Sequence, residues 1–508
     1  MTAVAAERPA WSGIPQPTTT SSAAGPGWAP GAATRVVAGD DLLTREVERL
    51  GAELTTVTDR GDGAGDLPGD VLLRLDPVPG WAPDGVAEAY RVEVGPGGVT
   101  VTGTDVAGVF RGTRQVLHTL RARGGLPSGS AVGVPAVPER GLHLDAARLR
   151  FRADWIAGLL RELAHVGLNL LQWHVSEDEG FGIESLSHPE VASPDALGRA
   201  EVRALLDLAD DLHVRVAPSL AMPGHLGQVL RAHPDLRLRG ADGAPVPGAL
   251  DLTDERAVRL ALDLVDELAG LFRPGVPWNI GADELLGADD VAAHPGLAAE
   301  AVRRFGTGAT GADLLVDFVN RVAAVVRGHG YRPQVWNDAM FRGAVVPLDR
   351  DVRVACWTGW HPRMAPLSAA LDRGHDVLNA HDALLYYVLG EHAGYAYPTA
   401  ERLAAHDWHP GLFAERRLPP GPDGAPRAAA QVLDPPYPPQ LRGAMAAIWC
   451  DVPGARTPDQ VAADVRAPLR AMAERAWNAG TRLGTAGLAG LDRAIGAAVA
   501  PATADPKG

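Results

Sequence analysis

The sequence predicts an α/β fold in which a (β/α)8 TIM barrel follows a small α+β domain. Eight short apolar runs recur between Arg140 and Asp451, and most of them are followed by a helical pattern. Strands that alternate with helices indicate a parallel sheet, and eight such units favour a barrel over the alternative, an open doubly wound sheet. Nearly every run ends in His, Asp, Glu, Asn or Trp, which is typical of barrels, where strand ends build the active site.

Two segments precede the barrel. Residues 1–35 are rich in Pro, Ser, Thr and Gly, and we expect a disordered lead-in there. Residues 36–134 predict the α+β domain. Its expected elements are a helix over 43–50, strands over 71–75, 90–94 and 99–102, and a helix over 108–120. The Pro/Gly/Ser-rich stretch 124–138 predicts a linker.

The catalytic barrel is expected over residues 139–480, and a flexible Ala/Gly-rich tail over 481–508. The runs expected to form its strands are residues 142–146, 168–175, 213–220, 278–281, 333–336, 352–357, 376–380 and 444–449. An Ala/Arg-rich helix over 462–477 is expected after the last strand.

Composition excludes several classes of protein. The 508 residues carry 47 Lys+Arg against 62 Asp+Glu, a net charge of −15, which argues against binding nucleic acid or an anionic membrane surface. Cys356 and Cys450 can form at most one bridge and have no zinc-site spacing. No apolar run is long enough to span a bilayer, and the first residues lack a secretory signal, so we expect a cytoplasmic protein, or a secreted one if the start is misassigned.

The densest chemical signal is the pair Asp283–Glu284 after Trp278–Gly281. An arbitrary acidic pair is usually solvated, but one at the end of a barrel strand favours a catalytic role. Neighbours on a strand point to opposite sides, so the two carboxylates are not expected to flank one bond as in ordinary retaining glycosidases.

Other strand ends carry candidate ligand-binding groups. Arg148 follows the first run, where its guanidinium suits neighbouring hydroxyls or an ion pair with Asp145. His174 ends the second run and leads into an acidic loop, and His225 lies in a Pro–Gly turn after the third. Tryptophans that end later runs suggest an aromatic box suited to a sugar face or a small apolar group; they are Trp336, Trp357 and Trp449.

Together these motifs resemble glycoside hydrolase family 20, the β-N-acetylhexosaminidases, from about Glu88 to Asp451. The motifs that carry the resemblance are residues 88–92, 108–112, 140–148, 169–184, 223–225 and 281–284. Residues 378–379, Tyr386 and 447–451 are similar to the dispersin and lacto-N-biosidase branch. The family has a small α+β domain and a barrel.

The resemblance implies a substrate and a mechanism. The substrate would be a carbohydrate ending in β-linked N-acetylhexosamine, hydrolysed with retention by its own 2-acetamido group and without a cofactor or metal. Glu284 would be the general acid and then the base, and Asp283 would orient the acetamide. Like-charge repulsion from Asp283 should raise the pKa of Glu284.

The resemblance also assigns the remaining candidates. Trp336, Trp357 and Trp449 would wall the acetamide pocket, and Tyr386 would bind the acetamide oxygen. Arg148 and Asp451 would bind hydroxyls of the terminal sugar. Glu177, His225 and Asp178 would support the acid and its partner, and Glu177 and His225 would also contact the substrate. Asp145 and His174 would lie behind them.

Four positions depart from the family pattern: Glu177, Asn279, Ala282 and Asp451. Asp451 is shorter than the usual Glu, which leaves open GlcNAc or GalNAc and release of a monosaccharide or a disaccharide. One alternative is a metal-dependent hydrolase built on His143, His174, His225 and Asp283. Another is a non-catalytic carbohydrate-binding protein on the same fold. The sequence gives no oligomeric state.

Overall fold

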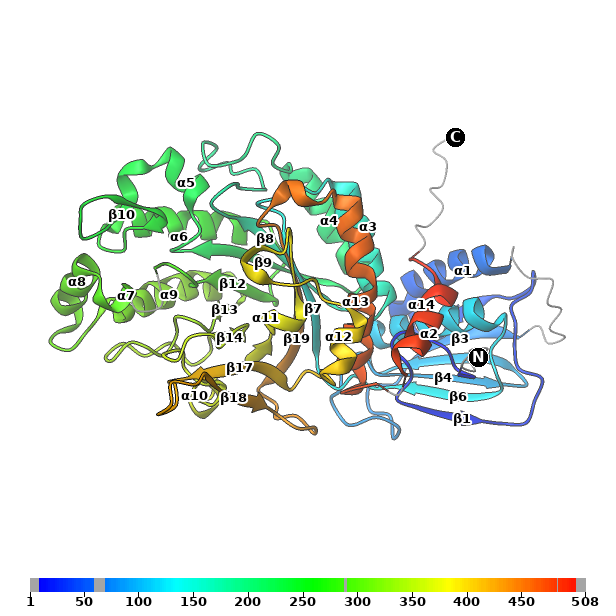
Figure 1. The fold of residues 1–508 in the computed structure, drawn as a ribbon. Helices are drawn as coiled ribbons and strands as arrows, with labels where there is room; N and C mark the ends of the chain where they lie inside the picture. Colours follow the sequence, from blue (N-terminus) through cyan, green and yellow to red (C-terminus); the bar gives the residue numbers. More distant parts are fainter. Residues whose placement is uncertain (1–8, 59–68, 287–289, 482, 499–508) are drawn as a thin grey trace.

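A closed barrel of parallel strands forms the larger part of the structure, a computed structural model that describes residues 9–58, 69–286, 290–481 and 483–498 (Figure 1). Its strands, in the order in which they pair, are β15 (Val377–Asn379), β14 (Arg353–Cys356), β13 (Arg332–Trp336), β12 (Pro277–Gly281), β9 (Arg215–Met222), β8 (Leu170–Ser176), β7 (Glu139–Asp145) and β19 (Leu441–Trp449). Pairing of β15 with β19 closes the ring. The predicted TIM barrel is confirmed, and each of the eight runs overlaps one of its strands.

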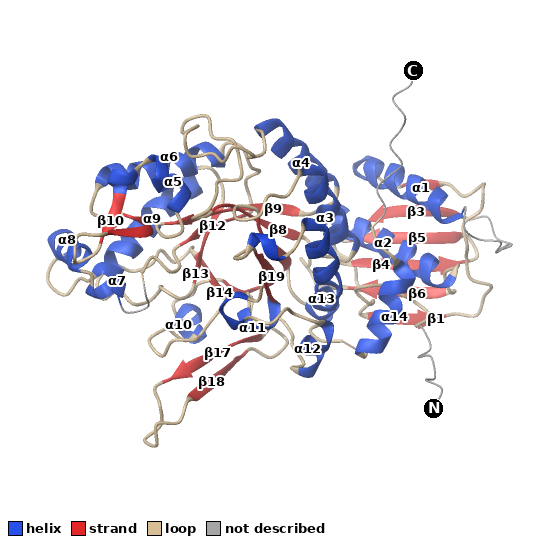
Figure 2. Cartoon of the chain, turned by 45° about the horizontal axis from the view of Figure 1, so that its top comes forward, coloured by secondary structure: helices blue, strands red, loops and turns tan. Residues whose placement is uncertain are grey.

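Helices surround the barrel strands (Figure 2). The longer ones are α3 (Ala153–His165), α4 (Arg199–Asp211), α6 (Glu255–Ala269), α8 (Pro295–Phe305), α9 (Gly311–Gly328) and α13 (Pro458–Asn478). Short ones are α5 (Gly227–Ala232), α7 (Asp290–Ala293), α10 (Leu367–Asp372), α11 (Asp382–Leu385) and α12 (Ala400–Ala405). The apolar faces of these helices and of the strands form one continuous core, in which Trp173, Trp278 and Trp408 are fully buried.

Small strands extend the loops that follow the barrel strands. They are β10 (Arg237–Arg239) with β11 (Pro245–Leu250), β16 (Tyr386–Val388), and β17 (Leu412–Leu418) with β18 (Arg427–Val432). The strand β16 pairs in parallel with the end of β19 and so raises the wall of the barrel there.

The smaller domain is a six-stranded sheet covered by helices. Its strands, in pairing order, are β1 (Thr19–Ser22), β6 (Gly129–Gly133), β4 (Tyr90–Gly95), β5 (Gly98–Gly103), β3 (Asp70–Leu75) and β2 (Val36–Ala38). The helices α1 (Thr44–Thr58) and α2 (Val106–Arg123) lie over one face, and α14 (Thr485–Ile495) packs against α2 (Figure 2). Glycine at position 112 lets α2 approach the sheet, since a Cβ there would lie 2.4 Å from Val101.

Three expectations about less regular segments were wrong in part. The lead-in is folded from residue 9 onward: β1 pairs with β6, and Trp11, Ile14 and Trp28 are buried. Residues 1–8 lie outside the described residues. The expected linker contains β6 of the smaller domain's sheet, and the expected tail contains α14, which packs against α2 of the smaller domain and α13 of the barrel. All three segments fold for the same reason. Each one adds to an existing sheet or helix, so it needs little apolar surface of its own.

A buried ionic cluster joins the smaller domain to the barrel. Glu88 accepts hydrogen bonds from Arg111 of α2 at 3.0 Å, from Arg140 of β7 at 2.6 Å and from Asn169 at 2.5 Å. Burial raises the pKa of Glu88, but the two guanidiniums outweigh it and lower the pKa to about 2. These motif residues therefore hold the two domains together at the amino-terminal end of the barrel, away from the strand ends.

Among the described residues, no helix combines the length and the apolar character that crossing a membrane requires.

Candidate active site

A cavity of about 490 Å³ opens at the carboxyl ends of the barrel strands. Acidic, cationic and aromatic side chains all line it. The lining residues are Arg148, Glu177, His225, Asp283, Glu284, Trp336, Trp357, Trp360, Tyr386, Val388, His392, Ala393, Tyr395, Trp449 and Asp451. The ten residues predicted to be catalytic or to bind substrate are all in this set. The size suits a ligand pocket, and the position is that of active sites in TIM barrels.

The acidic pair follows β12 on a kinked stretch of backbone. Gly281, Ala282 and Glu284 have φ of 88°, 64° and 45°. At Gly281 the backbone approaches β9 so closely that a Cβ would lie 2.9 Å from Ala221. Left-handed backbone at Ala282 and Glu284 is costly and is typical of functional sites. It breaks the strand alternation, so both carboxylates line the same cavity, and the expectation that they face opposite sides was wrong.

His225 lies between three carboxylates. Its Nδ1 is 3.1 Å from Oε2 of Glu177, and its Nε2 is 3.8 Å from Asp283 and 3.7 Å from Glu284. The other oxygen of Glu177 meets Nε2 of His174 at 3.3 Å, and Nδ1 of His174 meets the Ser219 hydroxyl at 2.9 Å. A chain of hydrogen bonds thus runs from Ser219 in the barrel interior to His225, whose Nε2 faces the acidic pair at ion-pair distance.

The charges in this chain follow from burial and pairing. Burial lowers the pKa of His225, but the charge and hydrogen bond of Glu177 outweigh it and hold that pKa well above its usual value. Burial raises the pKa of Glu177, yet His225, His174 and Arg148 bring it well below the ordinary range. Glu177 and His225 therefore form an ion pair beside the acidic pair.

Both carboxyls of the pair have raised pKa values. Burial is the main cause of the pKa of about 7 at Asp283, and Asp338 and Glu284 add to it. Burial also raises the pKa of Glu284, with help from Asp338 and Glu177. The raised pKa of Glu284 agrees with the direction predicted from the sequence, but the main cause of the shift is burial. Asp283 is 14% exposed and Glu284 51%, so Glu284 reaches toward the open side of the cavity.

Arg148 forms the ion pair with Asp145 that was considered from sequence, and it also lines the cavity. It pairs with Asp145 at 3.0 Å and with Glu177 at 3.0 Å, and its guanidinium still lines the cavity. Asp145 is fixed in turn by backbone N–H groups, including that of Cys450 at 2.9 Å. The remaining predicted cavity acid, Asp451, lies close enough for Arg148 to lower its pKa, although burial raises it overall.

Aromatic rings form one wall of the cavity. Trp357 and Tyr386 stack with an interplanar angle of 2° and centroids 6.0 Å apart. Trp449 lies 6.1 Å from Trp336 and 6.0 Å from Tyr386, centroid to centroid. These four rings lie together in the lining of the cavity that Asp283 also lines.

The expected supporting residues Asp145, His174 and Asp178 lie outside the cavity lining, whereas Glu177 and His225 are part of it. Asp145 and His174 are buried beneath Arg148 and Glu177. Asp178 is turned toward α5, where Oδ1 accepts from the Gly227 backbone at 2.8 Å. His143 contacts Gln172 at 2.8 Å and packs on Trp449 with centroids 4.1 Å apart.

Sequence reasoning assigned no role to several residues in or next to the cavity. Asp338 accepts from the indole N–H of Trp357 at 3.0 Å and from the backbone N–H of Glu284 at 3.3 Å, so it joins the aromatic wall to the acid. It lies two residues after the end of β13, and that position is a usable signal. Trp360, His392 and Tyr395 come from long loops, and nothing in their local sequence places them here.

Two groups among the described residues bring metal-binding side chains together: Glu177 with Asp178 and His225, and His188 with Glu190 and His233. Neither combines the residues of the metal-dependent alternative. In the first group Arg148 already neutralises Glu177, and Asp178 is bound to Gly227, so a cation would have to displace both.

Comparison with known proteins decides the family. The model described as "Glycosyl hydrolase family 20, catalytic domain" matches residues 138–480, and that described as domain 2 of the same family matches residues 12–137. The chain belongs to glycosyl hydrolase family 20. The family assigned by resemblance is thereby confirmed, and the cavity at the barrel mouth lies in the catalytic domain of a family 20 chain.

Relatives of this family 20 chain include a lacto-N-biosidase of Bifidobacterium bifidum, 29% identical over 89% of this chain and 38% of the relative. A β-N-acetylhexosaminidase of Cellulomonas fimi is 26% identical over 69% of each chain. The chain spans about two fifths of the length of the first curated relatives. A solved β-N-acetylhexosaminidase of Streptomyces coelicolor A3(2) shares the fold, with a TM-score of 0.71 at 22% identity over 99% of this chain and 100% of that one.

Proposed function

We propose that this family 20 chain is a retaining glycosidase that releases terminal β-linked N-acetylhexosamine through the substrate's 2-acetamido group. The observation that carries the proposal is the convergence of Asp283 and Glu284 on one cavity with an aromatic wall. A family that contains hexosaminidases and a lacto-N-biosidase supports a carbohydrate substrate. The proposal includes the division of the chain into the smaller domain and a catalytic unit formed by residues 139–480.

In the first step Glu284 is the general acid. Its raised pKa keeps a proton available, and its half-exposed side chain faces the side where a leaving group would extend. The acetamide carbonyl oxygen attacks the anomeric carbon, the glycosidic C–O bond breaks, and the Glu284 proton moves to the leaving oxygen. The products are an alcohol and an oxazolinium ion.

Asp283 acts on the acetamide. Deeper in the cavity than Glu284, its carboxylate accepts the acetamide N–H and so increases the electron density of the carbonyl oxygen. The rings of Trp336, Trp357 and Trp449 confine the methyl group. In the second step Glu284 takes a proton from water, the water oxygen bonds to the anomeric carbon, and the acetamide is regenerated with overall retention.

The remaining cavity residues bind the sugar. The Arg148 guanidinium donates hydrogen bonds to the ring hydroxyls, and the Asp451 carboxylate accepts hydrogen bonds from them. The Tyr386 hydroxyl donates to the acetamide oxygen. His225, held as a cation by Glu177, is placed to stabilise the ionised form of Asp283. His174, Asp145 and Asp178 keep Glu177, Arg148 and the α5 turn in position.

The test is hydrolysis of nitrophenyl N-acetyl-β-glucosaminide and the galacto analogue by wild type, Asp283→Asn and Glu284→Gln, with nitrophenyl β-glucoside as the substrate lacking the acetamide. We expect cleavage of the acetamido substrates only, with kcat reduced about 10²–10⁴-fold in each variant. Cleavage of the plain glucoside at a similar rate would contradict substrate assistance. Cleavage of a nitrophenyl lacto-N-bioside alone would instead assign disaccharide release, and binding without any cleavage would assign a carbohydrate-binding protein.

A further inference from the structure

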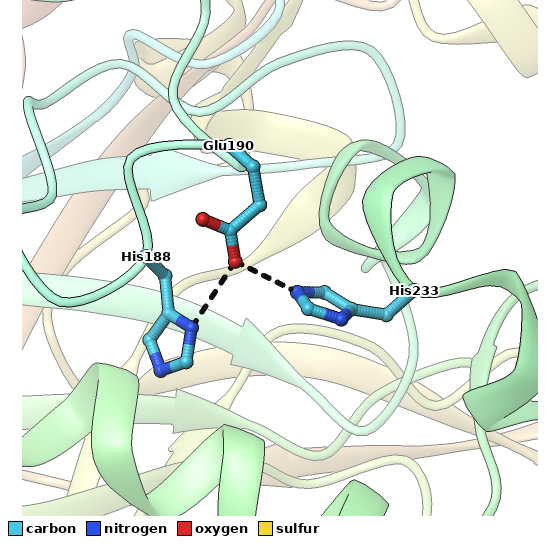
Figure 3. Close-up of side chains that lie close together, drawn as sticks. All are labelled: His188, Glu190 and His233. Atoms are coloured by element: carbon cyan, nitrogen blue, oxygen red, sulfur yellow. Dashed lines mark hydrogen bonds and ion pairs between the residues drawn. The ribbon is translucent and has the colours of Figure 1, made fainter.

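A second cluster of titratable side chains lies outside the cavity. His188 and Glu190 belong to the loop between β8 and α4, and His233 directly follows α5. Figure 3 shows one nitrogen of each imidazole aimed at the same oxygen of Glu190. The distances to Glu190 Oε1 are 3.3 Å from Nδ1 of His188 and 3.1 Å from Nε2 of His233. We propose that His188, Glu190 and His233 form a binding site for a transition-metal dication such as Zn²⁺.

The spacing of the donor atoms fits a tetrahedral ion. All three donor atoms lie within 4.8 Å of one another. Ligands about 2.0–2.1 Å from a tetrahedral zinc lie roughly 3.3–3.4 Å apart, which is close to the two separations seen here. The ion replaces the imidazole protons that otherwise bridge to the carboxylate.

The chemistry of the donors selects the class of metal. Two imidazoles and one carboxylate suit Zn²⁺, Cu²⁺ or Ni²⁺, whereas Ca²⁺ and Mg²⁺ prefer oxygen ligands throughout. The side chain of Glu190 is 44% exposed and those of the histidines 20% and 26%, so water can complete the coordination. Its own backbone N–H and the two imidazoles lower the pKa of Glu190, which keeps the carboxylate ionised.

The backbone holds the three ligands in place. The N–H of His188 donates to the Ser185 hydroxyl at 3.0 Å, and the N–H of Val191 donates to the carbonyl of His188 at 3.1 Å. Across the gap, the Gln228 side chain of α5 donates to the carbonyl of Val191 at 3.1 Å. The nearest cation on α5, Arg231, is engaged with Gln228 and with the backbone of Asp178.

A metal here would join two segments that also shape the cavity. The loop that carries His188 begins at Glu177, and α5 begins directly after the turn that carries His225. The same segments are already connected where Gly227 donates to Asp178 at 2.8 Å. Metal bound at their far ends should therefore stabilise the fold without taking part in glycoside cleavage, and the inference does not depend on the proposed function.

The experiment is Zn²⁺ titration of the tag-free full chain by calorimetry, together with thermal denaturation with and without Zn²⁺. The variants are His188→Ala, His233→Ala and Glu190→Gln. His329→Ala is the matched control, because His329 pairs with the single carboxylate of Asp266 at 2.7 Å and has no second imidazole. Circular dichroism verifies that each variant is folded.

We expect the wild type and His329→Ala to bind one Zn²⁺ more than His188→Ala or His233→Ala, or to bind it at least about tenfold more tightly. We expect Zn²⁺ to raise the denaturation midpoint of only the first two proteins. Equal Zn²⁺ affinity and equal midpoints in wild type and both histidine variants would overturn the proposal, and so would the same loss in His329→Ala. The cluster would then be a pair of imidazole–carboxylate hydrogen bonds.

Discussion

The imidazole of His225 contacts the carboxylate of Glu177 at 3.1 Å and presents its other nitrogen to both Asp283 and Glu284. Glu177 thus sets the charge of the imidazole that faces the acidic pair. A buried anion that keeps a histidine protonated also favours ionisation of the next carboxyl along the chain of contacts. The pH dependence of the active site should therefore be controlled by a residue that need not touch the reacting atoms.

Removing the charge of Glu177 should shift the pH profile. In Glu177→Gln, His225 loses its main stabilising partner and its pKa falls. A neutral imidazole no longer opposes the burial that raises the pKa of Asp283 to about 7. We expect the acid limb of kcat/KM to move to higher pH. Glu179→Gln is the control, since Glu179 also contacts Arg148 but is 54% exposed; an equal shift there would refute the role of Glu177.

The hydrogen bond between Trp357 and Asp338 should matter for catalysis as well as packing. Trp357→Phe keeps an aromatic ring beside Tyr386 but removes the N–H that Asp338 accepts at 3.0 Å. Asp338 also accepts from the backbone of Glu284, so its displacement should disturb the acid, and we expect kcat to fall about tenfold. Trp155→Phe, which loses an indole bond to Pro458 outside the cavity, should keep wild-type kcat.

The ionic cluster at Glu88 should be a large contribution to stability. Glu88→Gln leaves two buried guanidiniums without their carboxylate, and we expect unfolding free energy to drop by about 3–5 kcal/mol in urea denaturation. Asp70→Asn breaks an exposed pair with Arg35 and should change stability little. Comparable losses in the two variants would show that the cluster does not join the domains.

The same cluster predicts a pH effect. The pKa of Glu88 is about 2 in the folded chain, below its ordinary value of 4.5, so its contribution is complete above the ordinary value and is lost as pH falls toward 2. The stability difference between wild type and Glu88→Gln should therefore narrow between pH 5 and roughly pH 3. A difference that stays constant over that interval would argue against an ionised Glu88.

The sequence was most informative where strands end. Alternating runs and strand-end polar residues predicted the barrel, and every residue expected to meet the substrate lines the cavity, including Asp451 and Tyr386. Parallel strands bring their carboxyl ends together, so position along each strand was sufficient to group these side chains. The pairing of Arg148 with Glu177 needed three-dimensional proximity and was not predicted.

Other features could not be predicted from local patterns. Ala282 has a positive φ although it is not glycine, and it follows Gly281, where the backbone closely approaches β9. The strand β1 looked too polar to fold because it is an exposed edge strand that relies on β6. Trp360 and Tyr395 reach the cavity from loops whose course is set by tertiary packing.

The most direct test of the central claim varies the nucleophile in the substrate. Nitrophenyl β-glucosaminides carrying acetamido, fluoroacetamido and trifluoroacetamido groups differ in the electron density of the carbonyl oxygen that is proposed to attack. If Asp283 and the aromatic wall serve that attack, kcat/KM of the wild type should fall steeply with each added fluorine. Equal kcat/KM across the series would contradict substrate-assisted cleavage and require a nucleophile on the protein.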